Sequence, residues 1–343
     1  MGKVLIPQKG MYQVDVECEN ATGKWLYDEW KLRLTNMSTD KVTCNLAFTT
    51  ITKTNLNNYI IGLSGTTQGT GEVVNENGYR YEGKNPNNYI WFNNELWRII
   101  GVFDEASHGV SGQNLVKIIS TNSIGGLVWD NEIEDLGLVE NFYGKNDWSN
   151  SDLKNLLNGA YLNSENGTGG EYCYGYEYVP ANCDYSGTGV NDTYRPMIKN
   201  VTWYLGGHSS PSATAEAFYG YERGTTVYSG RPTSTEGYIG LMYPSDYGYS
   251  VLASSCARTT NLDSYDKATC AGQSWLYGEG IEWTITPFSS DLANVFFLYG
   301  YGSLWNSYAN YGWAAVRPVL YLDSSVYVYD GNGSVSAPYI IGM

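Results

Sequence analysis

The chain has 343 residues, of which 42% are hydrophobic, and this content is enough for a packed core and excludes general disorder. Its formal net charge is −15 and no basic patch occurs, so we expect no nucleic-acid partner, because phosphate binding needs clustered Lys and Arg. Asn, Ser and Gly interrupt the most apolar stretch, so we also expect no membrane span in this chain.

The chain begins with residues that alternate between apolar and polar, a period of two that predicts β-strands. The alternation covers residues 12–18 and 42–48, and residues 25–34 continue it. It predicts a small β-sandwich-like domain over residues 1–60, loosely like an immunoglobulin arrangement, in which Cys18 and Cys44 clip two facing strands around Trp30.

Beyond this unit the composition changes. Residues 61–80 are rich in Gly, Thr and Asn and are predicted to form a linker or a long loop. A second domain over residues 81–343 opens with a hairpin, because two apolar runs flank Asn93-Asn94, a pair suited to positive φ.

Two helices are predicted in this second domain. Ser151 can cap the first, which carries a stripe of leucines at positions 153, 156 and 157 and is expected to end at Gly159. The second covers residues 212–221. Short strands are predicted at residues 238–242, 283–285, 316–322 and 338–341.

Six cysteines fall into three near-neighbour pairs, Cys18 with Cys44, Cys173 with Cys183, and Cys256 with Cys270. Composition alone does not fix their pairing, but local spacing favours three sequential disulfides and an oxidising compartment. The alternative is six unrelated buried thiols. No CxxC motif supports a zinc site. No signal peptide follows Met1, so an exported protein would have its signal or anchor outside this chain.

The stretch from residue 292 to 316 carries no charge and is crowded with aromatic residues, interleaved with Asn, Ser and Gly. This is the composition of a binding surface, because large rings supply contact area and small polar residues supply hydrogen bonds. The alternative is a Tyr-rich core. The predicted ligand-binding residues are Asn294, Phe296, Phe297, Tyr299, Tyr301, Ser303, Trp305, Asn306, Ser307, Tyr308, Asn310, Tyr311 and Trp313.

An ordered series of weak motifs resembles a known group of proteins. The series runs Asn-Glu-Leu-Trp-Arg-Ile-Ile (94–100), Trp148 with Ser-Asp-Leu (151–153) and Leu-Leu-Asn-Gly (156–159), Gly-Leu-Met-Tyr-Pro-Ser-Asp-Tyr-Gly-Tyr (240–249), Trp-Leu-Tyr (275–277), Glu-Trp-Thr-Ile-Thr-Pro (282–287) and Val-Arg-Pro-Val-Leu-Tyr-Leu (316–322). It resembles bacterial surface proteins with a C-type-lectin fold, above all the variable ligand-binding proteins of diversity-generating retroelements.

The resemblance implies an α+β, C-type-lectin-like (formylglycine-generating-enzyme-like) fold behind the small N-terminal all-β domain. It also implies a binding face just before the Val-Arg-Pro strand. We expect Arg317 to anchor that strand through hydrogen bonds to backbone or carboxylate groups. In diversified members the variable positions arise from Asn codons. Most aromatic and polar residues of the 292–316 stretch fit that origin, but Trp305 and Trp313 do not, so the sequence leaves diversification open.

Enzyme chemistry has little support in the sequence. His108 and His208 lie in Gly/Ser loops and are expected to be solvated, and no GxSxG motif accompanies them. The acidic run Asp130, Glu132, Glu134 and Asp135 is expected to be a solvated loop. Cys256 and Cys270 do not resemble the catalytic pair of the formylglycine-generating oxidase.

The sequence also lacks the sugar-site motifs of calcium-dependent lectins. We therefore expect no catalytic residue, no metal site and no cofactor, with a structural calcium left open because oxygen ligands are plentiful.

We therefore expect a non-catalytic, exported surface or extracellular protein that binds a protein or glycan on another cell or host surface. The alternatives are an enzyme on the same fold, either an oxidase or glycan-acting, and a structural surface or pilus subunit.

Overall fold

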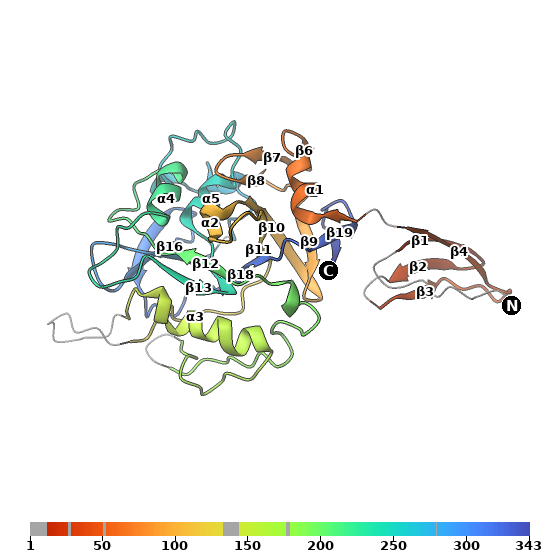
Figure 1. Ribbon diagram of the computed structural model, residues 1–343, viewed down its shortest axis with the longest axis horizontal. Helices are drawn as coiled ribbons and strands as arrows, with labels where there is room; N and C mark the ends of the chain where they lie inside the picture. Colours follow the sequence, from red (N-terminus) through yellow and green to blue (C-terminus); the bar gives the residue numbers. More distant parts are fainter. Residues whose placement is uncertain (1–11, 27–28, 51–52, 133–143, 176–178, 279) are drawn as a thin grey trace.

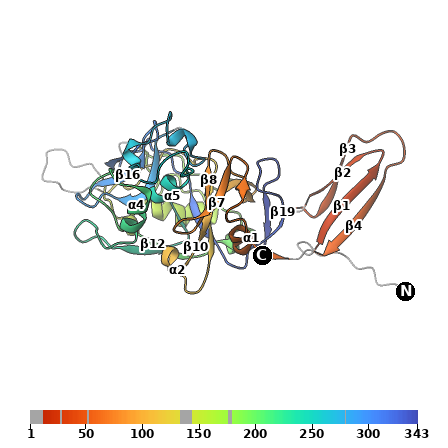
Figure 2. The ribbon, with the colours of Figure 1, turned by 90° about the horizontal axis from the view of Figure 1, so that it is seen from above.

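The computed structural model describes residues 12–26, 29–50, 53–132, 144–175, 179–278 and 280–343. The architecture is mixed α+β, with many short strands and few short helices. Strands β1–β4 stand apart from a larger body that contains all the helices (Figures 1 and 2). Within the described residues, no helix is both long enough and apolar enough to cross a membrane.

The small N-terminal unit consists of two antiparallel strand pairs. β1 (Tyr12–Glu19) pairs with β4 (Thr43–Thr50), and β2 (Thr22–Leu26) pairs with β3 (Lys31–Thr35). The period of two thus predicted β1 and β4 correctly, whereas the range 25–34, expected to continue it, is divided between β2 and β3.

The disulfide of this unit joins neighbouring strands. Cys18 lies directly opposite Cys44 in the β1–β4 register, so the bond links two strands of one sheet. The expectation of a bridge between facing strands, as in an immunoglobulin domain, is wrong, because the two cysteines are cross-strand neighbours within one sheet. Trp30 instead packs edge-on against Trp25, with ring centroids 5.2 Å apart.

The larger body is built on an 11-stranded sheet in the order β14-β18-β11-β10-β9-β20-β19-β5, to which β8, β7 and β6 are attached through β10. Its pairs are antiparallel except for β20 with β9. The strands are β5 (Thr54–Asn55), β6 (Thr67–Gln68), β7 (Gly71–Asn75), β8 (Tyr79–Gly83), β9 (Tyr89–Phe92), β10 (Glu95–Phe103), β11 (Leu115–Ser120), β14 (Ile239–Gly240), β18 (Val319–Leu322), β19 (Tyr327–Asp330) and β20 (Tyr339–Gly342).

Residues 61–80 are part of this sheet and not a linker. They contain the end of α1 (Leu56–Gly62), the strands β6 and β7, and the start of β8. The prediction failed because the Gly and Asn residues that suggested a flexible segment form tight turns, with positive φ at Gly69, Asn77 and Gly78. The larger body therefore begins near β5.

The predicted hairpin and the first predicted helix are present. Asn93 and Asn94 adopt φ of 55° and 61° between β9 and β10. Ser151 caps α3 (Asp152–Leu156) by accepting a hydrogen bond from the Lys154 N–H. The helix does not end at Gly159, because a π-helical turn (Leu157–Tyr161) carries the chain on to the buried ring of Tyr161.

Further short elements complete the larger body. The helices are α2 (Glu105–His108), α4 (Ala215–Glu222), which lies within a few residues of its prediction, and α5 (Pro244–Tyr249). β12 (Val201–Tyr204) pairs with β13 (Ser234–Gly237), and β15 (Glu282–Pro287), β16 (Asn294–Leu298) and β17 (Leu304–Tyr308) form an antiparallel sheet. The other two disulfides join Cys173 to Cys183 and Cys256 to Cys270, as the local spacing predicted.

Candidate ligand-binding face

The aromatic stretch from residue 292 to 316 forms the β16–β17 hairpin and the turn that follows it. In the register of these strands Phe297 lies opposite Trp305, and Asn294 lies opposite Tyr308. Since successive side chains of a strand point to opposite faces of the sheet, Phe297 and Trp305 share one face, and Phe296 and Asn306 share the other. The stretch is thus divided between two environments, a division that its composition does not reveal.

Five of the large rings are largely exposed. The exposed fraction is 68% for Tyr301, 63% for Trp313, 55% for Trp305, 44% for Tyr308 and 42% for Tyr299. The other predicted contact residues with partial exposure are Asn294, Ser303, Asn306, Ser307, Asn310 and Tyr311.

Two of the predicted ligand-binding residues belong to the core. Phe296 is fully buried and packs against Phe218 and Phe288, with ring centroids 5.3 Å and 5.4 Å away. Phe297 is 4% exposed and packs against Trp283. The prediction of direct ligand contact is wrong for both residues, because their rings have no polar group to keep them at the surface and fill the space between the sheet and its neighbours.

Phe297 nevertheless organises the surface above it. Its ring lies 6.3 Å from that of Tyr299 and 6.4 Å from that of Tyr311, and these two rings lie 5.6 Å from those of Tyr301 and Trp313 respectively. Five rings therefore follow one another in a row, with a buried ring in the middle and exposed rings at both ends. We call these residues, together with Trp305, the aromatic face.

The turn at one end of the aromatic face is fixed by tyrosines from outside it. The Tyr277 hydroxyl donates to the Gly300 carbonyl and the Tyr247 hydroxyl donates to the Gly302 carbonyl, each over 2.7 Å. Gly302 has a φ of 97°, a conformation that favours glycine. The backbone of this turn is therefore held by residues that do not themselves form the exposed surface.

The segment between the aromatic face and β18 is anchored by an ion pair. Arg317 donates through Nε and Nη2 to the two carboxylate oxygens of Glu282, each over 2.7 Å, and through Nη2 to the Leu276 carbonyl. This is the anchoring role expected for Arg317. Burial raises the pKa of Glu282, and the guanidinium opposes that shift by favouring the charged form.

The two histidines differ in their surroundings. His108 is fully buried at the end of α2, where its ring contacts the Phe103 carbonyl, and burial lowers its pKa. His208 is stacked on Tyr221, with centroids 4.1 Å apart, and burial lowers its pKa as well. The expectation of a solvated loop residue is wrong for His108, which is fully buried in α2, whereas His208 lies in a loop and is partly exposed.

The acidic run begins with a buried carboxyl group. Asp130 is 3% exposed and accepts hydrogen bonds from the backbone N–H groups of Glu132, Lys145 and Asp152. Burial and repulsion from Asp152 raise its pKa to about 7, and burial raises that of Asp152 to about 6. Asp130 is therefore not part of a solvated loop. Glu134 and Asp135 lie outside the described residues.

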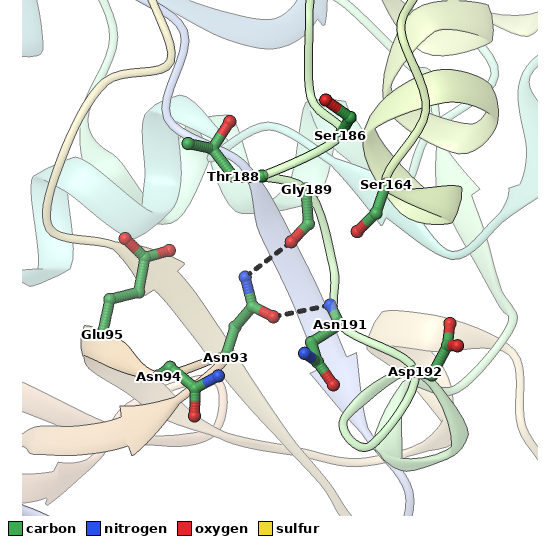
Figure 3. A pocket seen from close by; sticks show the side chains of 10 residues that line it. Asn93, Asn94, Glu95, Ser164, Ser186, Thr188, Gly189, Asn191 and Asp192 are labelled. Carbon is green, nitrogen blue, oxygen red and sulfur yellow. Dashed lines mark hydrogen bonds between the residues drawn. The ribbon is translucent and has the colours of Figure 1, made fainter.

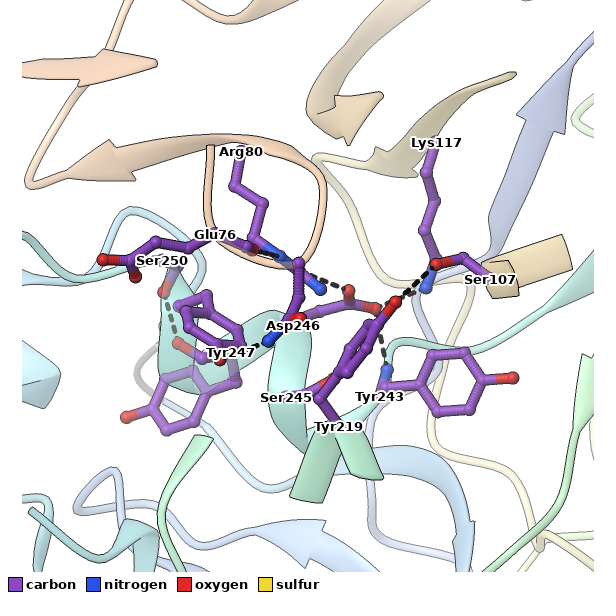
Figure 4. Close-up of polar contacts among 12 residues, drawn as sticks. Glu76, Arg80, Ser107, Lys117, Tyr219, Tyr243, Ser245, Asp246, Tyr247 and Ser250 are labelled. Atoms are coloured by element: carbon purple, nitrogen blue, oxygen red, sulfur yellow. Dashed lines mark hydrogen bonds and ion pairs between the residues drawn. The ribbon is translucent and has the colours of Figure 1, made fainter. Parts of the chain in front are cut away.

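A cluster of buried charges surrounds Asp246 on α5 (Figure 4). Its carboxylate pairs with Lys117 over 2.5 Å and with Arg80 over 3.0 Å, and all three side chains are 1% exposed. Burial lowers the pKa of Lys117 to about 8. Burial by itself raises the pKa of the Asp246 carboxyl. The positive charges of Lys117 and Arg80 outweigh burial and bring that pKa below its ordinary value. The sequence did not single out this cluster, since its members are distant in the chain.

The charged cluster has the properties of a structural network. Rings of Tyr243, Tyr321, Trp203 and Phe103 lie within 4.4–5.7 Å of the Lys117 ammonium. The three charges are thus enclosed by aromatic rings and almost fully removed from water. In the part of the chain that the structure describes, no group of three or more His, Cys, Asp or Glu could hold a metal ion.

Comparison with known proteins gives no match to a family model, to a curated protein or to a solved structure.

Proposed function

We propose that this protein is a non-catalytic binding protein that contacts a protein or glycan ligand through the aromatic face. The observation that carries the proposal is the exposure of Tyr301, Trp305 and Trp313, each more than half accessible, within a stretch that has no charged residue. Exposed rings of this kind stack on the apolar faces of sugars and act as anchors in protein interfaces. Solvating such rings is unfavourable, so a ligand that covers them gains free energy.

We further propose that the larger body has a C-type-lectin-like fold and that the protein is exported to a cell surface or the extracellular space. The motif series between residues 94 and 322 supports the first point. The three disulfides support the second, because such bonds persist in oxidising compartments. Retroelement diversification is tested by genomic context: a neighbouring reverse transcriptase and a near-copy of the last coding segment would establish it.

The test of function is a screen of the parent protein against arrays of glycans and of surface proteins, followed by titration of each ligand found. Trp305→Ala and Trp313→Ala should weaken binding by about 2 kcal/mol, or roughly thirtyfold. The matched control is Tyr238→Ala, which removes a ring that is 42% exposed outside the aromatic face. If both Trp variants bind every ligand as tightly as the parent, the aromatic face is not the binding site.

A further inference from the structure

A second candidate site lies at the tip of the β9–β10 hairpin. A cavity of about 420 Å³ opens there between the turn at Asn93-Asn94 and a wall formed by Ser164 and residues 186–192 (Figure 3). None of its lining residues belongs to the aromatic face. This volume falls within the usual range for pockets that hold small molecules.

Hydrogen bonds within the protein join the two walls of the cavity, so the cavity is preformed. The Asn93 side chain donates to the Gly189 carbonyl over 3.0 Å and accepts from the Asn191 N–H over 2.7 Å. The same loop is closed by the Cys173–Cys183 disulfide. Because these walls are already fixed, the protein loses little conformational entropy when a ligand binds.

The lining has a distinct chemistry. It consists of amide, hydroxyl, carboxyl and glycine backbone groups, and it includes no aromatic ring, no Lys and no Arg. A neutral sugar therefore finds no ring on which to stack, and an anion finds no basic side chain. The Ser164 hydroxyl donates to the Val190 carbonyl and the Ser186 hydroxyl to the Asp184 carboxylate, so both offer a ligand an acceptor oxygen and not a donor. Together with the Thr188 hydroxyl, these acceptors suit a ligand with donating hydroxyl groups of its own.

Glu95 gives the cavity its charge preference. Its side chain is partly buried, and Oε1 accepts a hydrogen bond from the Trp97 indole over 3.0 Å, which fixes its orientation. Burial raises its pKa, and no cation lines the cavity to compensate the carboxylate. A second carboxylate, that of Asp192, lies at the rim of the cavity; its side chain is 90% exposed and pairs with Arg195. A partly desolvated carboxylate of this kind gains most from a charged hydrogen-bond donor.

We propose that this cavity binds an amino sugar, with its protonated amino group on the Glu95 carboxylate and its hydroxyls on the amide and hydroxyl lining. The cavity has room for a ligand of one or two sugar units. A bare metal ion fits less well, since the cavity is much larger than an ion and its lining contains only two carboxylates.

The test uses the full chain and glucosamine as the probe, with backbone amide chemical shifts and calorimetry as readouts. Glucosamine should bind and shift the amides of Thr188 and Asn191, which line the cavity. Glucose, which has the same ring without the amine, and glucuronate, which carries a negative charge, should bind at least about tenfold more weakly.

Glu95→Gln keeps the shape of the side chain and should weaken glucosamine binding by about tenfold or more. Glu171→Gln is the control, because Glu171 lies in the same loop and does not line the cavity. The proposal is overturned if glucosamine does not bind, if glucose binds equally well, or if Glu95→Gln folds and binds like the parent. Displacement of glucosamine by calcium at equal concentration would also overturn it, in favour of a metal site.

This site is independent of the proposed function at the aromatic face. Trp305→Ala and Trp313→Ala should leave the affinity for glucosamine unchanged, and Glu95→Gln should leave the aromatic-face ligand bound. Loss of both activities in a single folded variant would contradict the separation of the two sites.

Discussion

At the scale of single residues, the most consequential contact is the pair of parallel hydrogen bonds between Arg317 and Glu282. Arg317 is 11% exposed and Glu282 is 6% exposed, so both charges are largely removed from water. The pair joins the segment after the aromatic face to β15, and Arg317 also holds the Leu276 carbonyl. Removing one partner leaves the other buried without compensation, which is more costly than losing an exposed ion pair.

Arg317→Ala should therefore lower the free energy of unfolding by about 3–5 kcal/mol. Arg317→Lys should recover part of this loss, because an ammonium pairs with the carboxylate but cannot form two parallel bonds. Urea denaturation of the parent, Arg317→Lys and Arg317→Ala should give free energies of unfolding that decrease in this order. Ligand binding should be lost in Arg317→Ala only where the protein is unfolded, and an unchanged urea midpoint would refute the anchoring role.

Asp130 makes the stability depend on pH. Its pKa is raised from 3.8 to about 7 in the folded protein, so folding favours the protonated form. The stabilising contribution is complete below about pH 4 and is lost as the pH rises towards about 7. Asn at this position does not titrate. The stability of the parent relative to Asp130→Asn should therefore fall between pH 4 and 7 and stay level above about pH 8. Urea midpoints of both proteins across this range provide the measurement, and parallel pH profiles would contradict the assignment.

At the scale of elements, the β16–β17 hairpin determines which rings are available to a ligand. Its register places the residues of one aromatic stretch on two faces of the sheet. Phe296 lies on the face that packs into the core, and Phe297 lies on the face where it supports the exposed rings. Hydrogen bonds from Tyr247 and Tyr277 fix the connecting turn. The exposed rings of the turn are thus carried by a backbone that other residues stabilise.

Truncation should separate these two classes of ring. Phe297→Ala should cost about 3–5 kcal/mol of stability, because it opens a cavity under the row of rings. Tyr301→Ala, at a position that is 68% exposed, should shift the melting temperature by no more than a few degrees while weakening the binding of an aromatic-face ligand. Thermal unfolding of both variants, beside a titration of each, tests the distinction. A large loss of stability in Tyr301→Ala would show that this ring belongs to the core.

At the scale of the whole molecule, the structure contains two units of very different size. The N-terminal unit has a thin interior, in which Val14 is buried while Leu46 and Phe48 remain 36% exposed. The larger body has a continuous core that begins with Leu56 of α1. Both candidate sites are formed by residues of this larger body.

A fragment over residues 53–343 should therefore fold and keep both binding activities. A fragment over residues 81–343 should not fold, because it lacks Leu56, Ile60 and Val73, whose side chains are fully buried. Each such side chain contributes about 1.5–3 kcal/mol, and together they approach the total stability of a typical domain of about 5–15 kcal/mol. Circular dichroism and thermal unfolding of the two fragments provide the comparison. Cooperative unfolding of the shorter fragment would place the domain boundary after β7.

The sequence by itself determined features that depend on near neighbours in the chain. These include the β9–β10 hairpin, where Asn tolerates positive φ, the Ser151 cap, and the pairing of each Cys with its nearest partner. It also located the exposed rings, since their composition is that of a surface. The tertiary structure decided everything that depends on distant partners.

The strand register buried Phe296 and Phe297, and packing carried the first helix past Gly159. Long-range contacts also brought Lys117 to Asp246 and closed the Glu95 cavity with a loop that lies about seventy residues or more further along the chain. Composition describes how much apolar and polar surface a segment has. Only the fold determines which part of that surface meets another segment and which part meets solvent.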